Sequence, residues 1–237
     1  MYSHELETEY NPIPPALNLA GANYLLPEFS DMNPELTGFR VALVMSHGPE
    51  LSEFHVPVRY LRDRGAVVDV ITEDWVFDDQ PGEASGMVVL AQFLAVNVCV
   101  RADKRLSNVK AADYDALIIL GGAWNPIILR SKDAVLEFIR DSYSRRMLIA
   151  AICHGPQVLV SAKAFPAGTR VTGVKDIRVD LRNAGFVVVE DRPVVYDENE
   201  RLITSPDPQP ESQKAFCEAI GDYGKRLLAE RTSPVSA

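Results

Sequence analysis

A short apolar segment that ends in a cysteine on a tight turn constrains this sequence most. Residues 147–152 lead directly into Cys153, and His154 and Gly155 precede a stretch with a helical pattern. The segment matches the nucleophile-elbow pattern, which is a small residue, any residue, the nucleophile, any residue and glycine. In such an elbow a strained turn lifts the nucleophile clear of the backbone. The dipole and free N–H groups of the following helix favour thiolate over thiol. We therefore expect Cys153 to be a reactive nucleophile at a strand–helix junction.

A strand-end cysteine also has a simpler interpretation, because free cysteines are among the most buried residues and often only pack. Two further segments, 40–57 and 116–126, favour a functional role because each supplies residues that a cysteine enzyme needs after a predicted buried strand. Cys99 and Cys217 lie in apolar stretches, and we predict that both are buried packing residues.

The charge and the cysteine count limit the partners and the compartment. The net charge is −9 and no basic cluster is present, which argues against nucleic acid and against an anionic membrane surface as partners. A small-molecule substrate, neutral or cationic, stays possible. Three widely spaced cysteines fit a reducing compartment. With no signal-peptide pattern and no apolar run of membrane-spanning length, we expect a cytoplasmic protein.

Apolar strand patterns alternate with amphipathic helix patterns from residue 39 onward, in a chain whose 237 residues suffice for one domain. We expect a polar, Pro-rich extension over 1–38 that wraps the domain or joins an interface, one α/β domain over 39–230 and a tail over 231–237. Fully apolar strands between helices predict a parallel sheet covered on both faces, with ligands at the carboxyl ends of its strands. The expected strands are 41–45, 67–71, 116–120, 147–152, 186–189 and the pair 194–196 and 202–204; the expected helices are 53–64, 133–143, 155–163, 176–184 and 211–230.

Four segments together resemble the ThiJ/PfpI superfamily over about residues 39–229. They are residues 48–57 (GPELSEFHVP), 112–122 (ADYDALIILGG), 151–156 (AICHGP), and 171–173 (VTG) with 181–185 (LRNAG). The resemblance implies a flavodoxin-like, class I glutamine amidotransferase-like fold, a parallel sheet sandwiched by helices with a nucleophile elbow. It also implies relationship to intracellular protease I and to glyoxalase III/deglycase enzymes. It does not select one reaction, because the family spans several chemistries.

The resemblance also implies roles for individual residues. Cys153 matches the reactive cysteine, and Glu53 matches the acidic residue whose carboxyl contacts the thiol and moves its proton. The Gly121-Gly122 turn would supply a backbone N–H that pairs with the N–H of His154 to form an oxyanion hole. Without the cysteine motif, Glu53 would be interpreted as an exposed first-turn residue of a helix and the glycines as an ordinary turn. His154 is either a catalytic residue or one that only shapes the pocket.

The sequence departs from the family pattern in two places. The loop after Gly122 contains no carboxylate to orient His154, which makes peptide hydrolysis the weaker hypothesis, and Trp124 gives the pocket an aromatic wall. After Thr204 and Ser205 this chain lacks the arginine of many members, so an anionic substrate clamp is in doubt. The histidines and acid of the first loop, His47, Glu50 and His55, match no zinc spacing, and we expect no metal.

The function expected from these observations is a cofactor-independent cysteine enzyme, a hydrolase or lyase. Its Cys153 thiolate would add to a small electrophilic carbonyl compound, as in hydratase, lyase, glyoxalase-like, deglycase or amide-hydrolase chemistry. The alternatives are an intracellular cysteine peptidase and a non-catalytic redox sensor or chaperone-like stress protein. We also expect a homodimer or larger homo-oligomer.

Overall fold

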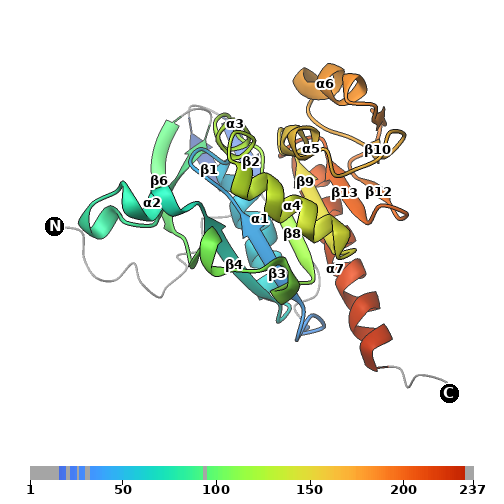
Figure 1. Cartoon of the computed structure of the whole chain (residues 1–237), viewed down its shortest axis with the longest axis horizontal. Coiled ribbons are helices and arrows are strands. Elements are labelled where there is room, and N and C mark those ends of the chain that lie inside the picture. The colour runs from blue at the N-terminus through green and yellow to red at the C-terminus, as the bar shows by residue number, and fades with distance from the viewer. Residues whose placement is uncertain (1–15, 20–21, 26, 30–32, 93–94, 233–237) are drawn as a thin grey trace.

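A seven-stranded, mostly parallel sheet forms the centre of the protein (Figure 1). We describe a computed structural model, which covers residues 16–19, 22–25, 27–29, 33–92 and 95–232. The strand order is β12-β13-β9-β8-β3-β4-β7, and only the β12–β13 pair is antiparallel. The strands are β3 (Arg40–Val44), β4 (Val67–Thr72), β7 (Lys104–Arg105), β8 (Ala116–Ile119), β9 (Leu148–Ile152), β12 (Val195–Asp197) and β13 (Leu202–Ser205).

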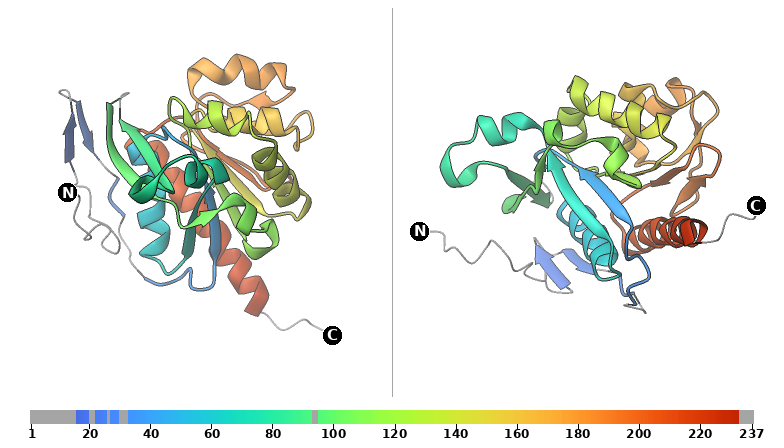
Figure 2. Two further views of the ribbon diagram at one scale, coloured as in Figure 1. Left: turned by 60° about the vertical axis from the view of Figure 1, so that its left-hand side comes forward. Right: turned by 60° about the horizontal axis from the view of Figure 1, so that its bottom comes forward.

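Helices cover both faces of this sheet, which confirms the predicted fold class. Figure 2 shows α1 and α7 together on one side, and α4 and α5 lie on the other. Alternate strand residues supply the two cores: Ile118 packs with α1 and α7, whereas Leu117 packs with α4 and α5. The helices are α1 (Leu51–Arg62), α2 (Asp74–Asp78), α3 (Asn125–Leu129), α4 (Asp133–Ser144), α5 (Pro156–Ala162), α6 (Arg178–Asn183) and α7 (Pro210–Thr232).

Among the described residues, three small strand pairs and four 3-10 turns surround the main sheet, and the sequence did not predict most of them. The expected helix over 176–184 is divided into a 3-10 turn and α6, and the expected strand 186–189 shortens to β11. The pairs are β1 (Ala16–Leu19) with β2 (Ala22–Leu25), β5 (Met87–Gln92) with β6 (Ala95–Arg101), and β10 (Arg170–Val171) with β11 (Val187–Val188); the 3-10 turns are Gly82–Ala84, Leu106–Asn108, Ala111–Asp113 and Lys175–Ile177.

The β5–β6 hairpin corrects one expectation about the cysteines. Val98 and Val100 pack against the core, and Cys99 between them is exposed, so the expected burial of Cys99 is wrong. Because side chains alternate between the faces of a strand, an apolar run in a hairpin can bury one face and leave the other in solvent. Cys217 on α7 is buried as expected.

The residues of the expected extension are only partly described. Residues 1–15 lie outside the described part, and Leu36 is fully buried in the core between α1 and α7. The limits of the extension, domain and tail therefore stay a prediction. Within the described residues, no helix has the length and apolar character needed to cross a membrane.

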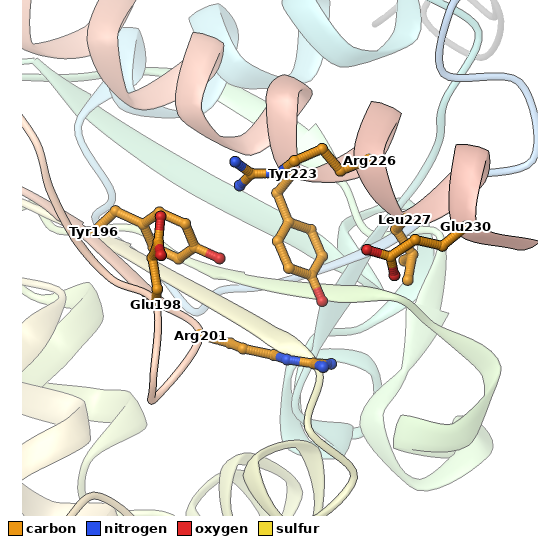
Figure 3. A pocket seen from close by; sticks show the side chains of 7 residues that line it. All are labelled: Tyr196, Glu198, Arg201, Tyr223, Arg226, Leu227 and Glu230. Carbon is orange, nitrogen blue, oxygen red and sulfur yellow. The ribbon is translucent and has the colours of Figure 1, made fainter.

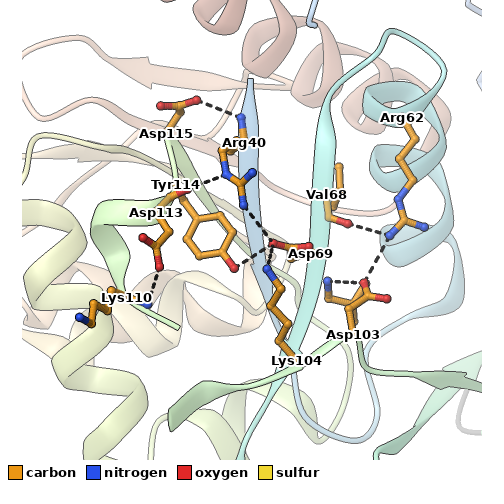
Figure 4. Close-up of polar contacts among 11 residues, drawn as sticks. Arg40, Arg62, Val68, Asp69, Asp103, Lys104, Lys110, Asp113, Tyr114 and Asp115 are labelled. Atoms are coloured by element: carbon orange, nitrogen blue, oxygen red, sulfur yellow. Dashed lines mark hydrogen bonds and ion pairs between the residues drawn. The ribbon is translucent and has the colours of Figure 1, made fainter. Parts of the chain in front are cut away.

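A polar network joins the outer strands of the sheet at Asp69 (Figure 4). The Asp69 carboxylate on β4 accepts hydrogen bonds from Lys104 Nζ at 2.7 Å and from Tyr114 Oη at 2.9 Å, and it lies 3.8 Å from the Arg40 guanidinium. The cations hold the pKa of the Asp69 carboxyl below its usual range, although burial opposes them. The network joins the short edge strand β7 to β4.

Candidate active site

Cys153 lies on a strained turn between β9 and α5. Its φ angle is 59°, in the left-handed region that non-glycine residues rarely adopt. The turn is held by two backbone hydrogen bonds: Cys153 N–H donates to the Ser205 carbonyl at 2.9 Å, and Val174 N–H donates to the Cys153 carbonyl at 3.1 Å. A Cβ atom on Gly155 would lie 2.7 Å from the Ile119 carbonyl oxygen, which explains the glycine in the motif. The nucleophile-elbow geometry predicted from the sequence is therefore present.

Glu53 reaches the elbow from the first turn of α1. The side chain is fully buried, and its Oε2 accepts a hydrogen bond from the Gly121 N–H at 2.7 Å. The same carboxyl interacts with the Cys153 thiol, and its buried Oε1 has no hydrogen-bond partner among the described residues. A Cβ atom on Gly121 would lie 2.8 Å from Cys153 Cβ and 2.9 Å from Glu53 Oε2. Glycine at 121 thus allows the acid and the thiol to meet.

The environment of Glu53 favours its neutral form. Burial raises the pKa of the carboxyl to about 8, and the charges of Glu50 and Asp207 add to this, while bonds to the thiol and to Gly121 oppose it. Burial also raises the pKa of the Cys153 thiol, as does negative charge on Glu53. Because a protonated Glu53 carries no charge and can donate a hydrogen bond, the two groups titrate as a coupled pair.

Two backbone N–H groups converge on the Cys153 sulfur. The N–H groups of Gly122 and of His154 both bond to the thiol and lower its pKa. Gly122 has a φ of +85°, and a Cβ atom there would lie 2.2 Å from the Gly48 carbonyl oxygen, so the turn requires glycine. The structure brings together the Gly122 and His154 donors that the sequence assigned to an oxyanion hole, whereas the N–H of Gly121, also expected there, donates to Glu53 Oε2 instead. Their action on a substrate stays a prediction.

His154 lies beside the sulfur. Its Nδ1 is 3.4 Å from Cys153 Sγ, and burial lowers the pKa of the ring while the charge of Asp176 raises it. Asp176 was not assigned to the site from the sequence. The signal that could have indicated it is its position three residues after Gly173, which lies in one of the segments that carry the family resemblance. Asp176 lies on the 3-10 turn Lys175–Ile177, two residues after the Val174 that bonds to the elbow. The loop after Gly122 indeed lacks an acid, but another segment of the same chain supplies one.

Trp124 and Asn125 follow the glycine turn and have different roles. The Trp124 side chain is 41% exposed and packs over Gly48, where a Cβ atom would lie 2.8 Å from Trp124 Cβ. Asn125 is fully buried; its Oδ1 accepts from Ser46 N–H at 2.6 Å and its Nδ2 donates to the Leu120 carbonyl at 2.8 Å. Asn125 therefore joins the carboxyl ends of β3 and β8, a positioning role that sequence reasoning missed.

The residues weighed as metal ligands have other contacts. His47 Nδ1 accepts a hydrogen bond from Val89 N–H at 3.1 Å, and its Nε2 lies 2.9 Å from the Gln80 side chain. Burial lowers the pKa of His47, so the neutral ring with its proton on Nε2 fits both contacts. Over the described part of the chain, no three His, Cys, Asp or Glu residues are grouped so that they could hold a metal ion.

A surface depression between β12 and α7 is separate from Cys153 (Figure 3). Arg201 precedes β13, whereas Ser205, at the other end of that strand, contacts the elbow. The depression is lined by Tyr196, Glu198, Arg201, Tyr223, Arg226, Leu227 and Glu230. Its charges are mixed, and Arg226 is placed over the Tyr196 ring at 5.7 Å.

The fold and this site define an α/β protein with a cysteine on a nucleophile elbow. The profile of the DJ-1/PfpI family matches residues 39–221, and the chain belongs to this family. General stress protein 18 of Bacillus subtilis is 33% identical over 171 residues, which cover 72% of this chain and 90% of that protein. Protein/nucleic acid deglycase 2 of Escherichia coli is 32% identical over 186 residues, which cover 77% and 98%. The solved structure of Schizosaccharomyces pombe DJ-1 superimposes with a TM-score of 0.64 at 22% identity, covering 82% of this chain and 99% of that one.

Proposed function

We propose that the protein is a cofactor-independent cysteine enzyme that acts on small electrophilic carbonyl compounds. The convergence on the Cys153 sulfur of the Glu53 carboxyl and the N–H groups of Gly122 and His154 carries this proposal. A relative with the name deglycase, at 32% identity over 98% of its length, supports it. The class of the reaction is a hydrolase or lyase whose first step is addition of sulfur to carbon.

The contacts suggest how that first step proceeds. The Cys153 thiol releases its proton to solvent, and the neutral Glu53 carboxyl donates a hydrogen bond to the resulting thiolate. The thiolate then adds to the carbonyl carbon as the C=O π pair moves to oxygen. The Gly122 and His154 N–H groups, which bond to sulfur in the free protein, stabilise the alkoxide that forms. Glu53 then delivers its proton to the alkoxide, giving a neutral hemithioacetal and a carboxylate. Isomerisation and deglycation can follow from this adduct, and hydration and amide hydrolysis begin with the same addition of sulfur to carbon.

A second candidate is amide or peptide hydrolysis, because of His154 and Asp176. The His154 ring lies 3.4 Å from Sγ, where it could protonate a leaving amine, and the Asp176 charge favours the imidazolium form. Asp176 is exposed, however, and acts on the ring through its charge. Weak orientation of the histidine makes this the second choice.

The non-catalytic alternative is a redox sensor in which Cys153 is oxidised to sulfinate. A thiolate beside a carboxyl and N–H donors also suits that chemistry. Turnover separates the two, because a sensor consumes oxidant stoichiometrically and an enzyme completes repeated cycles.

A substrate panel tests the proposal. 2-Oxoaldehydes, isonitriles, glycated amines and aminopeptidase substrates would be assayed with the wild type and with Cys153→Ser. We expect multiple turnovers on at least one carbonyl compound, and their loss in the variant. Turnover that survives Cys153→Ser, or activity on peptides alone, would contradict the proposal.

The location, the oligomeric state and the partners of the protein are also proposals. We propose a cytoplasmic location, on the basis of three unpaired cysteines. We propose a homodimer or larger homo-oligomer, supported by the exposed apolar side chains of Trp124 and Ile127 beside the site, of which Ile127 is 60% exposed. Nucleic acid and membranes are not among the proposed partners.

A further inference from the structure

Asp207 lies just beyond the strand that contacts the nucleophile. The Ser205 carbonyl accepts a hydrogen bond from Cys153 N–H at 2.9 Å, and the chain reaches Asp207 two residues later. Prolines at 206 and 208 restrict the backbone on both sides, and Asp207 Oδ1 accepts a hydrogen bond from Gln209 N–H at 3.0 Å. The carboxylate is therefore held at the carboxyl end of β13, beside the elbow.

Two other carboxylates are brought to the same place by backbone contacts. The Glu50 backbone lies against the glycine turn, since a Cβ atom on Gly122 would be 2.7 Å from Glu50 N. Asp176 follows by two residues the Val174 N–H that bonds to the Cys153 carbonyl at 3.1 Å. The charges of Glu50 and Asp207 act on Glu53, and the charge of Asp176 acts on His154.

Arg178, a cation whose side chain reaches the segment after the elbow, is already paired. Arg178 Nε donates to the Gly173 carbonyl at 3.0 Å, but its guanidinium bonds to Glu190 Oε2, also at 3.0 Å. Lys175 is exposed and adjacent to Asp176, and it is Asp176 whose charge acts on His154. The charges that act on Glu53 and on His154, those of Glu50, Asp207 and Asp176, are therefore all acidic.

We infer that the site selects electrophilic carbonyl compounds that carry a positive charge, such as amino carbonyl compounds, over anionic ones, and that Asp207 sets this preference. A carboxylate close to a binding site favours a cation there and repels an anion. The inference rests on the proposed function and names its substrate class. This chain has Asp207 two positions after Ser205 and lacks the arginine that would favour an anion there.

A pair of charged thiol reagents tests the preference without requiring turnover. Cationic 2-(trimethylammonium)ethyl methanethiosulfonate and anionic 2-sulfonatoethyl methanethiosulfonate react alike: the thiolate attacks the sulfenyl sulfur, a mixed disulfide forms and methanesulfinate leaves. Rates at Cys153 would be measured in a Cys99→Ser background, because Cys99 is exposed. Neutral iodoacetamide reports the intrinsic reactivity of the thiol, and glutathione gives the intrinsic ratio of the two charged reagents.

We expect the ratio of the cationic to the anionic reaction rate to be larger at Cys153 than with glutathione. Asp207→Asn should reduce this ratio roughly three- to tenfold. Asn keeps the acceptor for the Gln209 N–H, and Asp207→Ser is a second variant that keeps a hydroxyl acceptor there. Glu218→Gln, an equal charge change at an exposed position of α7, should leave the ratio unchanged. A preference for the anionic reagent in the wild type would overturn the inference. So would a wild-type rate ratio in both Asp207 variants when their iodoacetamide rates are unchanged. Failure of the proposed function would instead appear as absent turnover with the charge preference intact.

Discussion

The carboxyl of Glu53 and the thiol of Cys153 meet beside Gly121, although 100 residues separate them in the chain. Gly121 N–H donates to Glu53 Oε2 at 2.7 Å, and the burial of Glu53 raises its pKa to about 8. Near neutral pH this acid therefore retains a proton that an exposed glutamate would lose. A thiol with a proton-bearing neighbour is the central feature of the site.

Replacing Glu53 by Gln should remove most turnover. The amide can donate a hydrogen bond but cannot exchange a proton with sulfur or substrate, so we expect kcat to fall roughly 10²- to 10⁴-fold. Steady-state kinetics on the substrate found in the panel would measure it, with circular dichroism to show that the fold is retained. Glu218→Gln, on the outer side of α7, is the matched control. Near wild-type kcat in Glu53→Gln would remove Glu53 from the mechanism.

The pH dependence of stability should report the same proton. Glu53 has a folded pKa of about 8, above its unfolded value of about 4.5, so the folded state binds more protons between these values. The contribution of Glu53 is therefore fully present below pH 4.5 and is lost as the pH rises through 8. Urea denaturation from pH 5 to 9 should show a decline in the unfolding free energy of the wild type that is shallower in Glu53→Gln. Equal slopes for the two proteins would show that Glu53 titrates normally.

Gly121→Ala should damage the site by steric overlap. The added Cβ would lie 2.8 Å from Cys153 Cβ and 2.9 Å from Glu53 Oε2, and we expect a loss of about 1–3 kcal/mol in the unfolding free energy together with lost activity. Gly82→Ala adds a methyl group without steric overlap, because nothing lies within 4 Å of a Cβ there, and its φ of +61° means that any loss of stability reports backbone strain alone. Denaturant titration measures both variants. A fully active and stable Gly121→Ala protein would contradict the packing described around the thiol.

The proposed oligomer should depend on the exposed residues near the glycine turn. We expect light scattering coupled to size exclusion to give at least a dimeric mass at micromolar concentration, and Ile127→Asp to weaken the association because it places a charge on an apolar interface. Val179→Asp is the control, since Val179 on α6 is similarly exposed, at 57% against 60% for Ile127. A monomeric wild type would exclude the oligomer. A dimer that Ile127→Asp leaves unchanged would place its interface elsewhere.

The sequence predicted the central sheet and the elbow because their signals are local. A fully apolar strand such as β8 is recognisable from its own residues, and the turn at Cys153 requires a glycine two positions on. The resemblance to known relatives, rather than periodicity, assigned Glu53 to the thiol. That contact joins α1 to β9, and no spacing rule predicts such a distance.

Other parts of the site could not be predicted because they depend on tertiary packing. Asn125 joins the ends of two strands through its amide, and Asp176 acts on His154 from a separate turn. The exposure of Cys99 follows from which face of the β5–β6 hairpin packs on the core, and its apolar sequence indicated only burial. In each case the outcome depends on which segment, distant in the sequence, packs against the residue.

The rate of Cys153 alkylation as a function of pH tests the central claim most directly. Iodoacetamide would be used in a Cys99→Ser background, comparing otherwise wild-type protein with Glu53→Gln. If the thiol and the carboxyl titrate as a coupled pair, the protein that retains Glu53 should show two titration steps in the alkylation rate, one with an apparent pKa near 8. Glu53→Gln should show a single step and lack the one near pH 8. Superimposable single-step profiles would contradict the account.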